Sequence, residues 1–194
     1  MHNDHIGDSL DAAKSLLLTS LASSGIDACL IPLPSHDDFD YQLFTRCVSP
    51  RDPSRIYRSL QNYTYRNHYK KDYLDELSVW FASEGSSMQA IVFDPDTGIR
   101  PDRDTNKFFS ISHLMRFLHD QPRCVIGVYQ HRGTGGLSFE KSLSLVAAEF
   151  AFGYDFGSAA ILFWAKEPAQ QTLERMRQMF MDSLNKKRLV LRSA

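Results

Sequence analysis

Cysteine is scarce in this chain of 194 residues, and its three copies form no pattern. Cys29, Cys47 and Cys124 are far apart and odd in number, and the sequence contains no CxxC pair. A disulfide framework and a zinc ribbon are therefore not expected. Reduced, buried thiols are the simpler interpretation.

Long hydrophobic runs are also missing. The run at 159–165 (AAILFWA) is far shorter than the roughly 20 apolar residues that a membrane-spanning helix needs. The first residues, MHNDHIGDSLDAAK, are polar and acidic, whereas a signal peptide starts basic and then turns apolar. We therefore expect a cytoplasmic protein with no membrane partner.

Neither sign of charge is in excess. Lys and Arg number 22 and Asp and Glu 23, which gives a net charge of −1. Any basic site must therefore be local. With 43% hydrophobic and 23% charged residues, the composition is that of a globular chain and excludes disordered and collagen-like classes. The length favours a single domain over residues 1–194.

The hydrophobic pattern predicts helices and strands in alternation. We expect strands at 26–33, 41–48, 88–93, 123–129 and 157–165, and helices at 9–24, 110–119, 138–152 and 167–184. Residues 53–83 are predicted to form one broken helix or two, within a helical, basic and tyrosine-rich insertion at about 51–84. Strands separated by helices favour an α/β domain: a Rossmann-like three-layer fold with a mostly parallel sheet flanked by helices.

Ligands of such sheets bind beyond the carboxyl ends of the strands, and the segment AIVFDPDTG (90–98) places polar residues at one such end. Asp94 follows the predicted strand, Pro95 stiffens the turn, and Asp96 and Thr97 come next. A carboxylate at this position can accept a hydrogen bond or a proton from an amine. The same residues are also ordinary turn formers, so a simple hairpin turn is the alternative.

A second strand end is YQHRGTGG (129–136). There Arg132 can bind a phosphate through two hydrogen bonds, His131 can act as an acid or a base, and Gln130 adds a further polar group. A plain flexible loop is the alternative. The QxxGxG spacing also resembles the pyrophosphate loop of the GCN5-related N-acetyltransferase family, which implies an acetyltransferase as a further alternative.

The third polar segment is HIGDSLDAAK (5–14). If a helix starts near residue 9, Asp11 and Lys14 are neighbours at i and i+3, and an exposed ion pair between them is the simplest account. Asp8 is then a capping residue. His5 is the remaining titratable group of the segment.

Taken together, HIGDSLDAAK and the later DPDT (94–97) resemble the adenine-N6 methyltransferases that act on large-subunit ribosomal RNA, whose motifs are HxG[ND]xxDxxK and DPP plus an aromatic residue. The resemblance implies that Asp94 accepts the amino group of the base and that Pro95 shapes the turn. It also implies that His5 and Lys14 line the same pocket, and that S-adenosylmethionine is the cofactor.

Two features depart from that family. The segment PSHDDFDY (34–41) has no glycine where the family carries a glycine-rich cofactor loop. Asp96 and Thr97 replace the second proline and the aromatic residue that stacks on the base. A catalytically inactive binding or regulatory module is therefore an alternative to an enzyme that modifies an exocyclic amine.

Another alternative is a metal-dependent phosphodiester hydrolase. Asp94 and Asp96 can share a Mg²⁺ or Mn²⁺ ion, and His131 follows the next strand. Under both enzyme hypotheses, we expect Asp94, Lys14 and His131 to meet at one rim of the sheet.

A nucleic-acid partner is indicated by residues 51–73, where cations alternate with tyrosines. Cations neutralise phosphates and tyrosine rings stack on bases. The alternative is a helix pair that buries its tyrosines and solvates its cations. The candidate nucleic-acid-binding residues are Arg55, Arg58, Arg66, Lys70, Lys71, Tyr63 and Tyr65.

Overall fold

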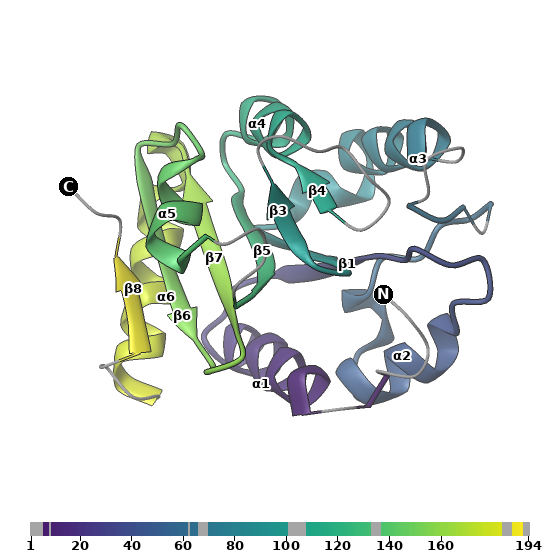
Figure 1. Cartoon of the computed structure of the whole chain (residues 1–194), viewed down its shortest axis with the longest axis horizontal. Coiled ribbons are helices and arrows are strands. Elements are labelled where there is room, and N and C mark those ends of the chain that lie inside the picture. Colours follow the sequence, from purple (N-terminus) through teal and green to yellow (C-terminus); the bar gives the residue numbers. More distant parts are fainter. Residues whose placement is uncertain are drawn as a thin grey trace.

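A computed structural model describes residues 6–7, 9–61, 63–65, 70–100, 108–132, 137–183 and 188–191. They form an α/β fold with a six-stranded sheet, a separate pair of short strands, and surrounding helices (Figure 1). The helices are α1 (Ser9–Ser23), α2 (Tyr41–Val48), α3 (Lys70–Ala82), α4 (Ile111–Asp120), α5 (Phe139–Ser144) and α6 (Gln170–Ser183). The strands are β1 (Ala28–Leu33), β2 (Ala90–Pro95), β3 (Gly98–Arg100), β4 (Phe108–Ser110), β5 (Val125–His131), β6 (Phe150–Asp155), β7 (Ala159–Ala165) and β8 (Leu189–Leu191).

The large sheet has the strand order β1-β2-β5-β7-β6-β8. The first three strands are parallel, and β7, β6 and β8 join by antiparallel pairing. The expectation of a mostly parallel sheet is therefore wrong, because the sheet is mixed. The physical reason is the short connection at 156–158, which reverses the chain between β6 and β7 and leaves no room for a crossover helix.

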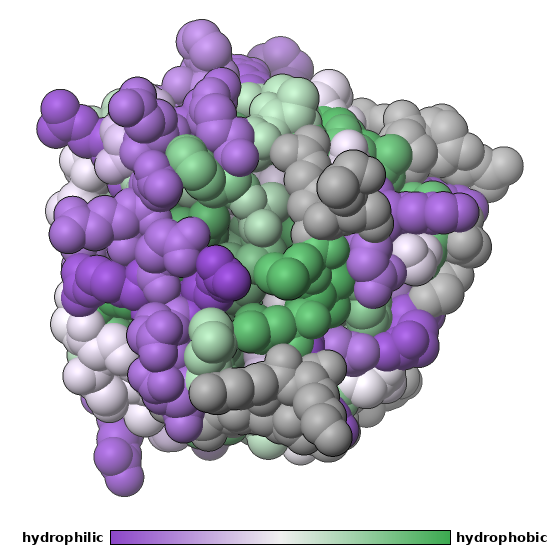
Figure 2. All heavy atoms as spheres, turned by 90° about the vertical axis from the view of Figure 1, so that its left-hand side faces the viewer, coloured by the Kyte–Doolittle hydropathy of each residue, from purple (hydrophilic) through white to green (hydrophobic). Residues whose placement is uncertain are grey.

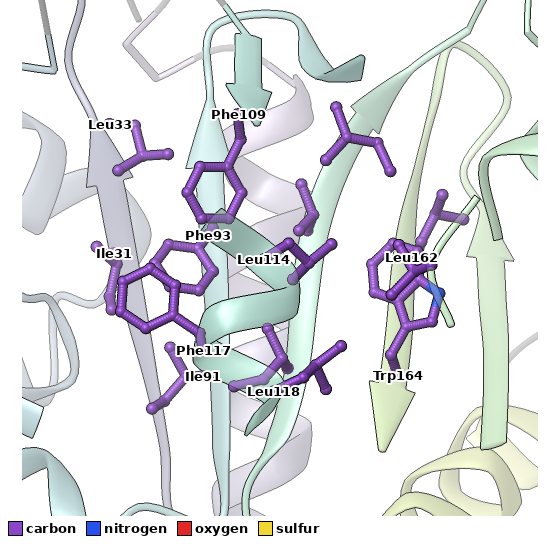
Figure 3. Packing of buried hydrophobic residues seen from close by; sticks show 14 of the residues in the cluster. Ile31, Leu33, Ile91, Phe93, Phe109, Leu114, Phe117, Leu118, Leu162 and Trp164 are labelled. Carbon is purple, nitrogen blue, oxygen red and sulfur yellow. The ribbon is translucent and has the colours of Figure 1, made fainter. Parts of the chain in front are cut away.

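Two hydrophobic clusters form on opposite faces of the sheet, because successive strand residues point to opposite sides. Leu30 and Val92 belong to the cluster with α1, α2 and α6. Ile31 and Phe93 belong to the cluster with α3, α4 and α5, part of which is shown in Figure 3. Helices therefore cover both faces of the sheet.

The segment 41–48, expected to be extended, is helix α2. The Asp40 carboxylate accepts a hydrogen bond from the backbone N–H of Leu43 at 2.9 Å, so Asp40 caps the helix. Tyr41, Phe44 and Val48 are buried, at the spacing of one helical face. Asp40 is therefore a start signal for a helix that the strand prediction missed.

The expected helical insertion is also only partly correct. Residues 53–55 form a short 3₁₀ turn, and the chain then runs beside β1, where the N–H of Tyr57 donates to Leu30 O at 2.9 Å. The N–H of Tyr65 donates to Pro34 O at 2.7 Å, and α3 begins only at Lys70. Leu60, which lies in this irregular stretch, is 87% exposed.

The predicted helix at 138–152 is shorter than expected. Ser138 caps α5, which ends at Ser144, and residues from Phe150 onward form β6. Phe152 and Tyr154 are two residues apart, as expected for one face of a strand, and both are buried. The apolar residues before them continue the helical pattern, so the sequence did not indicate where the helix ends.

The sheet ends at β8, a strand of three residues. Leu191 is 53% exposed there, and Figure 2, viewed from this side, shows a hydrophobic area among mainly hydrophilic side chains. So short an edge strand offers little backbone for pairing with another chain. Among the residues that the structure describes, no helix is long and apolar enough to cross a membrane.

The chain leaves the large sheet after β2 through Gly98, which has a φ of +105°. A Cβ atom at this position would lie 2.3 Å from Gln130 Oε1. The Oε1 atom accepts a hydrogen bond from the N–H of Ile99 at 2.8 Å, so the glycine and the glutamine together set the direction of β3.

We expect Gly98→Ala to destabilise the fold more than Gly157→Ala. Both positions have positive φ, which costs a residue with a side chain about 1–3 kcal/mol. Only Gly98 has a close neighbour, since a Cβ at Gly157 meets nothing within 4 Å. Urea unfolding of the two variants measures the difference. Equal losses of stability would show that the contact between Gly98 and Gln130 is unimportant.

Candidate functional site

The side chain of Lys14 connects helix α1 to the end of strand β2. Its Nζ lies 2.8 Å from Asp11 Oδ1 and 2.9 Å from Asp94 Oδ2. Asp11 and Lys14 are one helical turn apart, and Asp94 is close to the carboxyl end of its strand. Only 5% of Lys14 and 1% of Asp94 are exposed, so this is a buried ion-pair network and not the exposed pair of the simplest account.

Aromatic rings complete the surroundings of the ammonium group. Nζ lies 4.9 Å from the ring centre of Tyr129 on β5 and 5.6 Å from that of Phe44 on α2. Both distances are in the range of cation–π attraction, which is stronger in a desolvated site. Tyr129 was not predicted as part of the site. Tyr129 precedes His131 by two residues, and residues two apart in a strand face the same side of the sheet, so the sequence did contain this signal.

Burial and charge act in opposite directions on these groups. Burial alone lowers the pKa of Lys14, but the carboxylates of Asp94 and Asp11 outweigh burial and hold that pKa above its usual value. Burial raises the pKa of Asp94, and Lys14 opposes that rise. Lys14 is therefore an ammonium ion at neutral pH. It can fix a carboxylate, but it cannot act as a base.

His131 is the last residue of β5 and lies beside Tyr129. Its ring centre is 5.3 Å from that of Tyr129 in an edge-to-face arrangement, and the side chain is half-buried. The structure thus brings Asp94 and Lys14 into direct contact and connects His131 to them through the Tyr129 ring.

The turn after Asp94 is anchored at several points. Pro95 is buried at the end of β2, and Asp96 Oδ2 accepts a hydrogen bond from the Ser35 hydroxyl at 3.3 Å. Thr97 is half-buried, and Gln130 holds the next residue through the bond to Ile99. The turn is no hairpin, because β3 pairs with β4 and not with β2.

Arg132 has structural partners. Its guanidinium donates to Gly157 O at 2.6 Å and to the Asp155 carboxylate at 2.5 Å, and it lies 4.9 Å from the ring centre of Phe139. These contacts tie Arg132 to the β6–β7 connection. His5, Asp8 and the glycines of the QxxGxG spacing lie outside the described residues.

The carboxylates of Asp94 and Asp96 are not arranged as a pair of metal ligands. Asp94 is already paired with Lys14, and Asp96 with Ser35. Over the described ranges, no group of three or more His, Cys, Asp or Glu side chains is placed to hold a metal.

Several residues of the basic, tyrosine-rich segment make internal contacts. Arg55 pairs with Asp52 at 2.8 Å, and Lys71 pairs with Asp75. The Lys70 Nζ lies 4.4 Å from the ring centre of the fully buried Tyr65, and burial lowers the pKa of Lys70 to about 8.

The remaining candidates of that segment differ in exposure. Tyr63 is half-buried, Arg58 is exposed, and Arg66 lies outside the described residues. The segment therefore contains fewer solvent-directed cations than its sequence indicated.

Glu76 on α3 organises this segment and was not predicted. Its carboxylate accepts hydrogen bonds from Tyr57 Oη at 2.8 Å and Ser59 Oγ at 3.0 Å. It also accepts backbone N–H groups of Leu60 at 2.7 Å and Gln61 at 3.4 Å. The only sequence signal was a carboxylate within the hydrophobic pattern of a helix.

Comparisons with protein-family models, with curated proteins and with solved structures find no match to this chain.

Replacing Lys14 by Met should destabilise the fold by about 3–5 kcal/mol, because it leaves two carboxylates buried without their cation. Lys71→Met is the matched control, since its ion pair with Asp75 is exposed and its removal should have little effect. Chemical denaturation measures both. A loss for Lys14→Met as small as that of the control would contradict the buried network.

The stabilisation by Lys14 should also depend on pH. Because its pKa is raised in the folded state, the contribution is complete below the usual value of 10.5 and is lost as the pH rises through the folded value. The difference in unfolding free energy between the wild type and Lys14→Met should therefore stay constant from about pH 8 to about pH 10 and shrink above it. A difference that shrinks already near neutral pH would argue against a raised pKa.

Proposed function

We propose that the protein binds a nucleotide or a nucleic acid at the carboxyl ends of β2 and β5, and that the Asp94 carboxylate accepts a hydrogen bond from an exocyclic amine of the base. One observation carries this proposal: the buried Lys14 ammonium lies 2.9 Å from Asp94 Oδ2. It holds a carboxylate at the end of a parallel strand, where α/β sheets bind their ligands.

The surrounding groups support a ligand that carries a base. Tyr129 and His131 lie along the same side of the sheet, and their rings form an edge-to-face pair. His131, Asp96 and Thr97 are only half-buried, so they are more accessible than the buried Asp94 at the ends of β2 and β5. The three parallel strands favour a Rossmann-like interpretation of this half of the fold.

The residues after β1 fit S-adenosylmethionine poorly. No glycine occurs in 34–41, and the Ser35–Asp96 hydrogen bond links the turns that follow β1 and β2. The carbonyl of Pro34 accepts from Tyr65 N–H and that of Pro32 from Tyr73 Oη at 2.6 Å. The chain itself thus occupies backbone groups that a cofactor loop would keep open. We therefore propose binding without methyl transfer.

The experiment compares ligands that differ in one amine. Calorimetry of the wild type should show tighter binding of AMP than of IMP, and of CMP than of UMP, by roughly tenfold. IMP and UMP carry a carbonyl oxygen in place of the amine, and this oxygen would face the Asp94 carboxylate. In Asp94→Asn the preference should disappear, because the amide can also donate to a carbonyl oxygen.

Asp75→Asn serves as the matched control, since Asp75 is an exposed acid whose contact is to Lys71. This variant should keep the preference, and thermal unfolding checks that both variants are folded. A wild type without preference between the paired nucleotides would refute the role of Asp94. Binding heat with S-adenosylmethionine that vanishes in Asp94→Asn would favour methyl transfer over binding alone. Binding heat with Mn²⁺ that vanishes in the same variant would favour metal-dependent hydrolysis.

A further inference from the structure

A groove lies between helix α2 and the segment that follows it, away from Asp94. It consists of two adjoining cavities of about 370 Å³ each, which share Tyr41, Gln42 and Arg58. We call it the α2 groove. Both volumes are in the range of small-molecule pockets.

One end of the α2 groove is basic. Arg46 on α2 and Arg58 on the following segment line the same cavity, together with Thr45 and the apolar side chains of Pro53 and Ile56. In the part of the chain that the structure describes, neither arginine forms an ion pair. Two guanidinium groups around one cavity provide the planar donors that a phosphate group accepts.

The other end of the α2 groove is acidic. Asp37 and Asp40 line the second cavity, with Thr64 beside them. The Thr64 hydroxyl donates to Asp37 Oδ1 at 3.0 Å, and the N–H of Leu43 donates to Asp40 Oδ1 at 2.9 Å, so both carboxylates are fixed in direction. Carboxylate oxygens are the acceptors that the hydroxyl donors of a ligand require.

The backbone on both sides of Arg58 is held in place by contacts within the protein. The neighbours of Arg58 are held by Glu76, which accepts from Tyr57 Oη and Ser59 Oγ, and the guanidinium carbon lies 5.8 Å from the ring centre of Tyr41. A backbone that is already ordered loses less conformational entropy when a ligand binds.

We propose that the α2 groove binds a sugar phosphate, either free or as part of a nucleotide, with its phosphate between Arg46 and Arg58 and its hydroxyls toward Asp37 and Asp40. A groove with two arginines in one cavity and two carboxylates in the adjoining one is complementary to a ligand that has an anionic group at one end and hydroxyl donors at the other. This site does not depend on the function proposed for Asp94.

Calorimetry with ribose 5-phosphate, inorganic phosphate and ribose tests the proposal on the full chain. Ribose 5-phosphate should bind more tightly than inorganic phosphate, and ribose should bind weakest. Arg58→Ala and Arg46→Ala should each weaken the binding of ribose 5-phosphate about tenfold or more. Asp37→Asn should reduce the advantage of ribose 5-phosphate over inorganic phosphate.

Arg51→Ala is the matched control, because Arg51 is an exposed cation of the neighbouring loop that does not line the groove. It should leave the affinity for ribose 5-phosphate unchanged. Equal losses in Arg51→Ala and Arg58→Ala would reduce the effect to overall charge and overturn the proposal. It is also overturned if a single-stranded oligonucleotide binds while ribose 5-phosphate does not.

Discussion

The ammonium group of Lys14 connects the first helix to the sheet. It is shared by a carboxylate of its own helix and by Asp94 at the end of β2, and all three groups are buried. A buried ion pair costs desolvation, and here that cost is offset by short contacts and by the adjacent ring of Tyr129. The network therefore ties α1 to the end of β2 and holds the Asp94 carboxylate in one direction.

The two proposed sites differ in their chemistry. The site at Asp94 is a carboxylate paired with a cation that it shares with Asp11, which suits a ligand that donates hydrogen bonds at that point. The α2 groove has arginines without ion pairs among the described residues, which suits an anionic group. Glu76 accepts hydrogen bonds from Tyr57 Oη and from the N–H groups of Leu60 and Gln61, so it holds the backbone around Arg58, which lines the α2 groove.

Much of the fold could be predicted from the sequence, because strong local patterns dominate in β1, β2, β5 and β7. The sequence also indicated that Lys14 and Asp94 belong to one site, through a resemblance in two short motifs. The mixed pairing of the sheet could not be derived from the sequence. The apolar residues of β6 also fit the end of a helix, and the partner of β6 is set by the chain reversal at 156–158. The burial of Tyr65 and Lys70 was equally hidden, because a basic, tyrosine-rich segment has the same composition whether it faces solvent or the core.

The division of the sheet into a parallel and an antiparallel half has a consequence for the order of assembly. β6 and β7 adjoin in sequence, so their pairing closes only a small loop. β1 must wait for β2, from which it is separated by α2 and α3, and such distant pairing is slow. We expect the carboxyl-terminal hairpin to form early and to offer β7 as a template for β5. The edge that carries the α2 groove would then be among the last parts to reach its native arrangement.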